Sequence, residues 1–454
     1  YVRRSGVANV LELRTSMKTG WKSHVATLPR PPGFAAALPP GPLRDRLLKI
    51  AGVRRLLAKA VVALETQAHS VRDDMDKAVV NLESNGGRIT RLWNGDCTAQ
   101  VPCDVTVKPL RGYRRESAKV LAALRETGWQ EMSSLYASWM NAVGLNPMGA
   151  ADLPPPELAG TAPSITGVCQ VLDQYRNIMI RNEAGTLVSL DSEFLHEFRV
   201  AVRRTRSLLS RMKAVFDAQR FAHYKVEFSW LGGLTGPTRD LDVYLINMAS
   251  YRLGLDDDDI GALAPVERLL NKEQRKEQRK LARGLSSDRY KTLMRDWSAF
   301  LEAAPANAAD PLARKPLQDV ARRVIWRQFK RVHTQGRAIG VSTEADAVHA
   351  LRIECKKLRY LLEAFGPLFV DKKTRGLVSS LKRLQTNLGD FNDYEVQAKG
   401  LRQFALQLDK EGGTSAQTFL VMGRLIERLL GLQANERRTF HGYWDHFDTK
   451  TNAA

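Results

Sequence analysis

The chain has 454 residues, of which 44% are hydrophobic and 26% are charged, so its composition is that of an ordinary soluble globular protein. A chain of this length accommodates about two to four domains with substantial cores. The unusual feature is the sign of the charge, because 69 Lys and Arg oppose 49 Asp and Glu and give a net charge of +20. Such an excess attracts polyanions, whether nucleic acid, anionic lipid or a phosphate polymer, without choosing among them.

Nothing in the sequence predicts a disulfide framework or a membrane span. The four cysteines, Cys97, Cys103, Cys169 and Cys355, have no CxxC spacing, which favours reduced thiols in a cytoplasmic protein. No apolar run reaches the roughly 18 residues that span a bilayer, so we expect no membrane insertion. No secretory signal is visible, although the chain begins at Tyr1 without Met, which leaves an upstream leader open.

The first part of the chain has the pattern of mixed strands and helices. Alternating apolar residues predict a strand over Val101–Val107, and the sequence Asn85-Gly86-Gly87 predicts a turn. Apolar residues at helical spacing predict a helix over Tyr113–Ala137.

Two breaks rich in Pro and Ala divide the remainder. The stretch 146–165 predicts an interdomain linker, because Pro has no backbone donor and resists helix interiors, and Ala303–Pro311 is a shorter break. A 3.6-residue periodicity elsewhere after Ser164 predicts helices. The predicted fold class is therefore α+β overall, with a mixed region at 1–145 and an all-α domain whose two parts cover 166–302 and 312–446.

An internal repeat occupies the helical part. The sequence HEFRVAVRRTRSLL, which begins at His196, is matched by HALRIECKKLRYLL, which begins at His349, 153 positions later. Every basic position in the first copy has a basic counterpart in the second. The match continues at an offset of 150, where Asp240 meets Asp390 and Tyr244 meets Tyr394, and one short loop deletion explains the change of offset. Two copies of one helical module are therefore predicted.

Helical geometry places the basic residues of each copy on one face. At about 100° per residue, one stripe carries His196, Arg199, Arg203 and Arg206, and the other carries His349, Arg352, Lys356 and Arg359. Apolar residues such as Phe198 and Leu351 lie opposite and are expected in the core. An ordinary solvated face would interleave acids, but Glu197 and Glu354 lie off the stripes. We therefore predict that a polyanionic ligand supplies the missing negative charge.

The other polar residues of the repeat favour binding over catalysis. Each His either contacts phosphate or packs in the core, and no nucleophilic Ser or Cys recurs beside it. One His per copy, without a second ligand at i+3 or i+4, predicts no metal site, and no cofactor is expected. Asp240 and Asp390 each follow a Leu-rich helix, so we interpret them as structural residues that cap the next helix or pair with the basic stripe.

The duplicated HxxRxxxRR and HxxRxxxKKLRY helices, with the RDLD and GDFND segments, resemble the CHAD family (conserved histidine α-helical domain) over roughly Gly167–Asp445. The resemblance implies two pseudo-symmetric helical bundles whose basic helices face a shared cleft or pore. It also implies binding of inorganic polyphosphate and association with polyphosphate granules. Carried over by position, the implied ligand contacts are His196, Arg199, Arg203, Arg204, Arg206, His349, Arg352, Lys356, Lys357 and Arg359, with Lys225 and Arg375 as further candidates.

The N-terminal region resembles a CYTH domain, the triphosphate tunnel fold. Arg3-Arg4 and the segment Arg14–Gly20 are similar to its RxR and TxK strands, and Lys108–Gly112 is similar to the end of its acidic strand. The ExExK strand is absent from the chain, and the acidic strand carries Asp104, Thr106 and Lys108 at alternate positions. A triphosphatase needs several inward carboxylates to hold Mg²⁺ or Mn²⁺. Either upstream residues complete the site or the domain is a degenerate scaffold, which we favour.

The sequence thus predicts a non-enzymatic, cytoplasmic protein that binds inorganic polyphosphate and other phosphate polyanions. Two alternatives stay open, a CYTH-type triphosphatase whose helical domain holds the substrate and a nucleic-acid-binding protein. Recognition of single strands needs exposed aromatic side chains among the basic residues, and within the stripes only Tyr360, at the edge of the second, qualifies.

Overall fold

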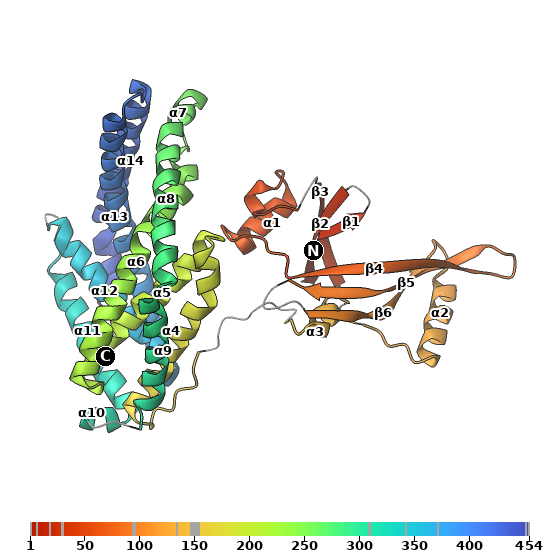
Figure 1. Cartoon of the computed structure of the whole chain (residues 1–454), viewed down its shortest axis with the longest axis horizontal. Coiled ribbons are helices and arrows are strands. Elements are labelled where there is room, and N and C mark those ends of the chain that lie inside the picture. The colour runs from red at the N-terminus through yellow and green to blue at the C-terminus, as the bar shows by residue number, and fades with distance from the viewer. Residues whose placement is uncertain are drawn as a thin grey trace. The chain divides into compact units, whose positions relative to one another are not determined.

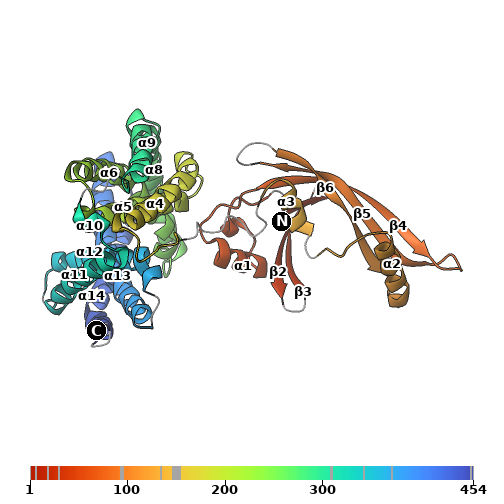
Figure 2. The same ribbon diagram turned by 90° about the horizontal axis from the view of Figure 1, so that it is seen from below.

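The structure, a computed structural model, divides into two compact units, residues 1–154 and 155–454, which are described separately below (Figures 1 and 2). It describes residues 2–5, 8–17, 20–28, 31–92, 97–132, 135–145, 155–306, 310–340, 343–369, 372–449 and 452. Residues 146–154 of the predicted linker lie outside the described residues, as do Lys18 and Thr19 of the predicted TxK strand.

The first unit contains two antiparallel sheets of three strands each. The first sheet consists of β1 (Val2–Ser5), β2 (Ala8–Met17) and β3 (Gly20–Leu28), and the second of β4 (Ala60–Arg72), β5 (Ala78–Arg91) and β6 (Cys97–Pro109). The helices are α1 (Pro42–Ala51), α2 (Arg114–Glu126) and α3 (Leu135–Ala142). Two small apolar clusters hold this unit together. Leu11 and Leu28 of the first sheet pack with Leu43 of α1, and Ile89 and Val101 of the second pack with Val143, which follows α3.

The predicted strand over Val101–Val107 is confirmed as part of β6. The turn predicted at Asn85-Gly86-Gly87 is wrong, because β5 runs through these residues and shifts register between Asn85 and Gly87. The glycine marks a β-bulge where two backbones approach closely. A Cβ atom at Gly87 would lie 2.1 Å from the carbonyl oxygen of Ala63 on β4.

The helix predicted over Tyr113–Ala137 is shorter in the structure. α2 ends at Glu126, and Gly128 follows with a φ of 90°, in the left-handed region that ends helices. A separate helix, α3, begins at Leu135. Trp129, which fits the helical pattern only irregularly, lies between them and is 38% exposed.

The second unit is helical throughout its described residues (Figure 1). The helices of the first copy are α4 (Ser164–Leu187), α5 (Ser192–Arg211), α6 (Ala218–Tyr251), α7 (Asp257–Ala262), α8 (Ala264–Leu285) and α9 (Asp288–Ala303). A short α10 (Pro311–Arg314) leads to the second copy, which consists of α11 (Leu317–Arg337), α12 (Ala345–Phe365), α13 (Lys372–Glu411) and α14 (Ala416–Phe447). The chain is thus α+β overall, with its helices concentrated in the second unit.

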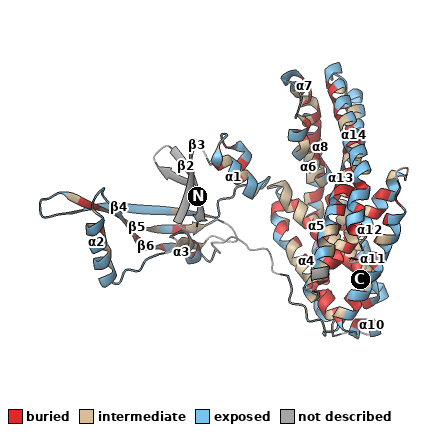
Figure 3. Cartoon of the chain, turned by 180° about the vertical axis from the view of Figure 1, so that it is seen from behind, coloured by how far each residue is buried: buried red, intermediate tan, exposed pale blue. Residues whose placement is uncertain are grey.

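The two copies share their hydrophobic cores. One buried cluster joins Phe198 of α5 to Leu317 of α11 and Phe365 of α12. A second joins α6 and α8 to α13 and α14, where the Tyr244 hydroxyl donates a hydrogen bond of 3.0 Å to the carbonyl oxygen of Val396. Figure 3 shows the buried residues concentrated where the helices of this unit meet. Because burial of apolar surface is the main stabilising term, neither copy is expected to be stable without the other.

Within the described part of the chain, no helix combines the length and apolar character needed to cross a bilayer.

Candidate polyanion-binding site

The faces predicted for α5 and α12 are confirmed. α5 begins after Asp191, whose carboxylate accepts hydrogen bonds from the backbone N–H of Glu193 (2.9 Å) and Phe194 (3.3 Å) and so caps the helix. On α5 the apolar stripe is fully buried, and on α12 the matching residues Leu351 and Cys355 are equally buried. The basic stripes therefore point away from these cores.

Arg203 of α5 and Lys356 of α12 occupy equivalent positions in the two copies, and they lie close together where α5 packs against α12. Burial, and to a smaller extent the positive charges of Arg352 and Arg203, lower the pKa of Lys356 to about 8. Neither Arg203 nor Lys356 has a hydrogen bond or an ion pair with any residue that the structure describes. This cross-copy pair is therefore a point of concentrated positive charge, which the nearby carboxylates of Asp240 and Asp393 offset only in part.

Arg199 and Arg352, also equivalent, flank this pair and each has a carboxylate nearby. A guanidinium nitrogen of Arg199 lies 4.0 Å from Asp240 on α6, and that of Arg352 lies 2.9 Å from Asp393 on α13. Burial still lowers the pKa of both arginines. The expectation that the stripes lack acidic partners is thus wrong in part, since helical periodicity within one helix cannot reveal carboxylates that a neighbouring helix supplies.

Asp240 and Asp390 lie in the interior of α6 and α13, so the interpretation that they cap a following helix is wrong. α6 continues through Pro237, because its packing against α5, α8 and α13 outweighs the local cost of the proline. Asp240 fits the other interpretation, because it pairs with Arg199 of the basic stripe. In the second copy the pairing belongs to Asp393, three residues beyond Asp390.

Arg204 and Lys357 lie beside the stripes and make ion pairs. Arg204 donates a hydrogen bond of 2.8 Å to Glu363 of α12, and Arg359 lies 3.2 Å from the other oxygen of the same carboxylate. Lys357 lies 2.5 Å from Glu354. Glu363 therefore compensates two of the predicted ligand contacts and joins α5 to α12.

The tyrosine at the edge of the second stripe is not available for stacking. Tyr360 is buried, and the guanidinium groups of Arg204 and Arg359 lie 5.9 Å and 5.6 Å from its ring centroid. The expectation of an exposed aromatic side chain at this position is wrong, because α12 buries this side as well as its core face.

The remaining cationic candidates are exposed. Arg206 of α5 lies against α6, where it donates a hydrogen bond of 3.5 Å to Ser229 and where a Cβ at Gly232 would lie 2.7 Å from its guanidinium. Lys225 is exposed one helical turn before Ser229, on the same face of α6. Arg375 is exposed near the start of α13. Lys225 and Arg375 make no hydrogen bond or ion pair with the stripes among the described residues, so their role stays a prediction.

The two histidines have different surroundings. His349 is hydrogen-bonded through Nδ1 to the side-chain oxygen of Asn392 on α13. Burial and the nearby Arg239 lower the pKa of His196, so its neutral form is favoured. The two residues are equivalent in sequence, but among the described residues only His349 has a side-chain hydrogen bond.

His196 also belongs to a group that could hold a cation. Ligand atoms of Glu193, His196 and Glu197 lie within 4.8 Å of one another. Glu193 lies three residues before the histidine. The prediction of no metal site considered only the positions three and four residues after the histidine and therefore did not include Glu193. Arg239 of α6 lies 3.9 Å from Glu193 and donates a hydrogen bond of 3.2 Å to the carbonyl oxygen of Ser192, so a positive charge already lies beside this group. Arg239 stands in the RDLD segment, the only sequence signal that could have placed it near the site.

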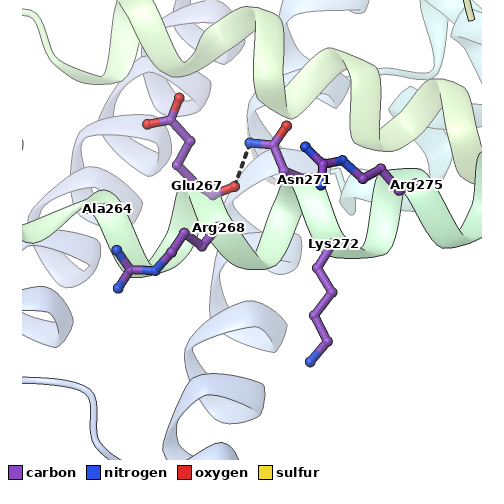
Figure 4. A pocket seen from close by; sticks show the side chains of 6 residues that line it. All are labelled: Ala264, Glu267, Arg268, Asn271, Lys272 and Arg275. Carbon is purple, nitrogen blue, oxygen red and sulfur yellow. Dashed lines mark hydrogen bonds between the residues drawn. The ribbon is translucent and has the colours of Figure 1, made fainter.

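A separate basic face lies on α8. Arg268, Lys272 and Arg275 line a hollow of about 450 Å³. Figure 4 shows their side chains along the helix. These side chains are exposed, as are Arg279 and Arg283 further along the helix. Lys272 lies 3.2 Å from Glu411, and the neighbouring Lys276 and Lys280 pair with Glu273 and Glu277. This face carries no aromatic side chain, and we interpret it as a solvated surface.

Comparison with known proteins agrees with this arrangement of helices. A family model described as the CHAD domain matches residues 170–402, just over half of the chain. The crystal structure of the CHAD domain from the plant Ricinus communis is 25% identical, with a TM-score of 0.55, and the similarity covers 67% of this chain and 99% of that one. The structure of PptA from Streptomyces chartreusis is 16% identical, with a TM-score of 0.49, and covers 63% of this chain and 100% of that one.

Two curated proteins of Mycobacterium tuberculosis, the uncharacterized proteins MT2285 (strain CDC 1551) and Rv2226 (strain H37Rv), are each 29% identical over 253 residues. The similarity covers 53% of this chain and 46% of each relative, so the chain spans about half the length of the curated relatives it matches. The fold and the site define a helical protein built around two equivalent cationic helices. The chain belongs to the CHAD domain family.

Proposed function

We propose that this protein binds inorganic polyphosphate, and that the chain of phosphates crosses the junction of α5 and α12. The observation that carries the proposal is the pair Arg203 and Lys356, two equivalent cations from the two copies that lie together and make no ion pair of their own among the described residues. Repulsion between the two cations lowers the stability of the folded protein, and a bound anion relieves this repulsion.

The surrounding residues fit a linear phosphate polymer. Arg199, Arg352 and Arg206 extend the positive surface on both sides of the central pair. Arginine offers a planar fork to phosphate oxygens and lysine a point charge, so the two residue types together hold a chain without demanding one fixed register. We further propose that the two copies are pseudo-symmetric halves whose basic helices face a shared cleft, and that binding brings the protein to polyphosphate granules.

We propose no catalytic role for the helical unit, and we interpret the N-terminal unit as a degenerate CYTH-like scaffold. Its second sheet supports this interpretation. Asp104 accepts a hydrogen bond of 2.8 Å from Asn85, and Lys108 lies 2.5 Å from Glu83, so the polar residues at these positions pair with each other across the strands. A CYTH-type triphosphatase is the second candidate, and phosphate release from tripolyphosphate with Mg²⁺ or Mn²⁺ would establish it.

The test is a binding titration of the full chain with long-chain polyphosphate, tripolyphosphate and duplex DNA over a range of salt concentrations. Binding by counterion release predicts an affinity for polyphosphate that falls linearly with salt on logarithmic axes. The variant Arg203→Glu should bind polyphosphate at least about tenfold more weakly, whereas Arg275→Glu on α8 should show only the small loss that one remote charge causes. Equal losses in both variants, or displacement of polyphosphate by DNA at equal charge concentration, would overturn the proposal.

A further inference from the structure

A second basic surface lies on α11, on the side of the helix opposite its core. Leu317, Phe329 and Val332 are buried in the cores of this unit. The outer side carries the exposed residues Arg322, Arg323, Arg327, Lys330 and Arg331, and Asp319 is the single acid of the helix. This surface differs from the α5 and α12 stripes, because an exposed tryptophan lies among its cations.

Trp326 is that tryptophan, and 44% of its surface is exposed. One side of the indole stacks on Phe329, with ring centroids 5.5 Å apart and planes inclined by 10°. Phe329 is itself buried in the core formed by α11 to α14, so it holds the indole in place. The ammonium of Lys330 lies 5.3 Å from the centroid of the indole ring. The indole is thus held in one position, is exposed to solvent and is surrounded by cationic side chains.

The cations around Trp326 have little compensation. Arg323 and Arg327 make no hydrogen bond or ion pair in the part of the chain that the structure describes, and Arg322 lies 3.9 Å from Asp319 with both side chains largely exposed. On α8, by contrast, several lysines have carboxylate partners and no aromatic side chain accompanies them. The combination of free arginines and an exposed indole therefore distinguishes α11 from the other exposed basic face.

The equivalent helix of the first copy, α4, has no surface like that of α11. α4 and α11 both begin directly after a proline, Pro163 and Pro316, and these two residues form a backbone bridge with each other. With that alignment, Arg323, Trp326, Arg327 and Lys330 correspond to Gln170, Asp173, Gln174 and Asn177 of α4. The first copy has neither a cation nor an aromatic side chain at these positions, so the α11 surface has chemistry of its own.

From these observations we infer that α11 binds single-stranded nucleic acid, with a base stacked on Trp326 and the neighbouring phosphates held by Arg323, Arg327 and Lys330. Aromatic side chains stack on bases of any sequence, and arginine and lysine follow the sugar-phosphate backbone. Arg323 and Lys330 lie about 10 Å apart along the helix, at about 1.5 Å per residue, which suits contact with a few nucleotides. Duplex DNA keeps its bases stacked inside and offers Trp326 no partner.

The test uses the full chain and a fluorescein-labelled oligothymidylate of about 12 nucleotides, followed by fluorescence anisotropy at low salt. Trp326→Ala should weaken binding about tenfold, and Trp326→Phe should restore most of the affinity because it keeps a ring at this position. Arg323→Glu/Arg327→Glu should weaken binding more strongly. Arg275→Glu/Arg279→Glu on α8 changes the net charge by the same amount and should cause a much smaller loss. Circular dichroism of each variant confirms that the helices are intact.

Three results would overturn the inference. Trp326→Ala could bind the oligonucleotide as the wild type does, the α8 variant could lose as much affinity as the α11 variant, or a duplex of equal charge could bind as tightly as the single strand. Polyphosphate binding separates this inference from the proposed function, because Trp326→Ala should leave it unchanged whereas Arg203→Glu should reduce it. Failure of the nucleic-acid inference therefore leaves the polyphosphate proposal untouched, and failure of the polyphosphate proposal leaves the inference untouched.

Discussion

Arg203 of α5 lowers the pKa of Lys356 of α12, although the two residues stand 153 positions apart in the chain. They are the same position of two copies of one helix, and equivalent positions meet at the point where two copies of a module face each other. A basic residue placed there once in the module therefore meets its own counterpart. The duplication itself therefore concentrates positive charge at this point, with Arg in one copy and Lys in the other.

The first prediction concerns the stability of the free protein. Lys356→Met removes a half-buried ammonium whose charged form is disfavoured and keeps the length of the side chain, so the free energy of unfolding should rise by about 1–3 kcal/mol at neutral pH. Urea denaturation of the helical transition measures this change. The same variant should bind polyphosphate more weakly. A fall in stability would show that the lysine makes favourable contacts in the free protein.

The adjacent Lys357 provides the matched control. It lies 2.5 Å from Glu354, a carboxylate that also accepts a hydrogen bond from Gln328. Lys357→Met removes a favourable partner from a half-buried acid, so it should lower the free energy of unfolding by about 1 kcal/mol. The two methionine variants, one residue apart, are thus expected to change stability in opposite directions.

A second prediction is the pH dependence of stability that Lys356 confers. Its pKa in the folded protein is about 8, below the value of about 10.4 expected in the unfolded chain. Between these values the unfolded chain binds more protons, so the unfavourable contribution of Lys356 is complete below pH 8 and disappears as the pH rises toward 10.4. The stability advantage of Lys356→Met should shrink in the same window.

Ligand binding has the opposite pH dependence at this residue. Polyphosphate favours the ammonium form, so the affinity of the wild type should fall as the pH rises through about 8. Lys356→Arg should bind with little change between pH 7 and pH 9, because a guanidinium stays protonated over this range. Isothermal titration in buffers of different ionisation enthalpy measures the proton uptake directly. An identical pH dependence in both proteins would exclude Lys356 as its origin.

A feature of the fold or of the site could be predicted from the sequence where a single helix determines it, but not where the packing of several helices does. The repeat and the 3.6-residue period predict both the buried stripe through Phe198 and Leu351 and the direction of Arg203 and Lys356, because these are properties of single helices. The carboxylates of Asp393 and Glu363 near the cations, and the burial of Tyr360, depend on how neighbouring helices pack. The sequence Asn85-Gly86-Gly87 predicts a turn, but in the structure Gly87 lies at a β-bulge within β5. A glycine is required there because the backbone of β4 approaches closely.

A fourth prediction tests the proximity of the central pair by a double-mutant cycle. Arg203→Glu places a carboxylate beside Lys356, and Lys356→Glu places one beside Arg203, so each single variant relieves repulsion and should be at least as stable as the wild type. The double variant brings two carboxylates together. Its free energy of unfolding should therefore fall below the sum of the single effects by about 0.5–1 kcal/mol, which thermal or urea unfolding of the four proteins resolves. Additive effects would mean that the two side chains do not interact.

The last prediction concerns Glu363, the acid that compensates two cations of the site at once. Arg204 donates to one of its oxygens at 2.8 Å and Arg359 lies 3.2 Å from the other, with about a third of the carboxylate side chain exposed (34%). Glu363→Gln removes the negative charge while it keeps the shape and one hydrogen-bond acceptor, so the free energy of unfolding should fall by about 1 kcal/mol. Two cations then become available to a ligand, and affinity for polyphosphate should rise by roughly two- to tenfold at low salt. Glu227→Gln serves as the control, because Glu227 of α6 pairs with Arg289 of α9 and neither residue belongs to the stripes. A gain of affinity in Glu363→Gln alone would show that ligand and carboxylate compete for the same guanidinium groups, and a loss would show that the ion pair holds Arg204 and Arg359 in the orientation that the ligand requires.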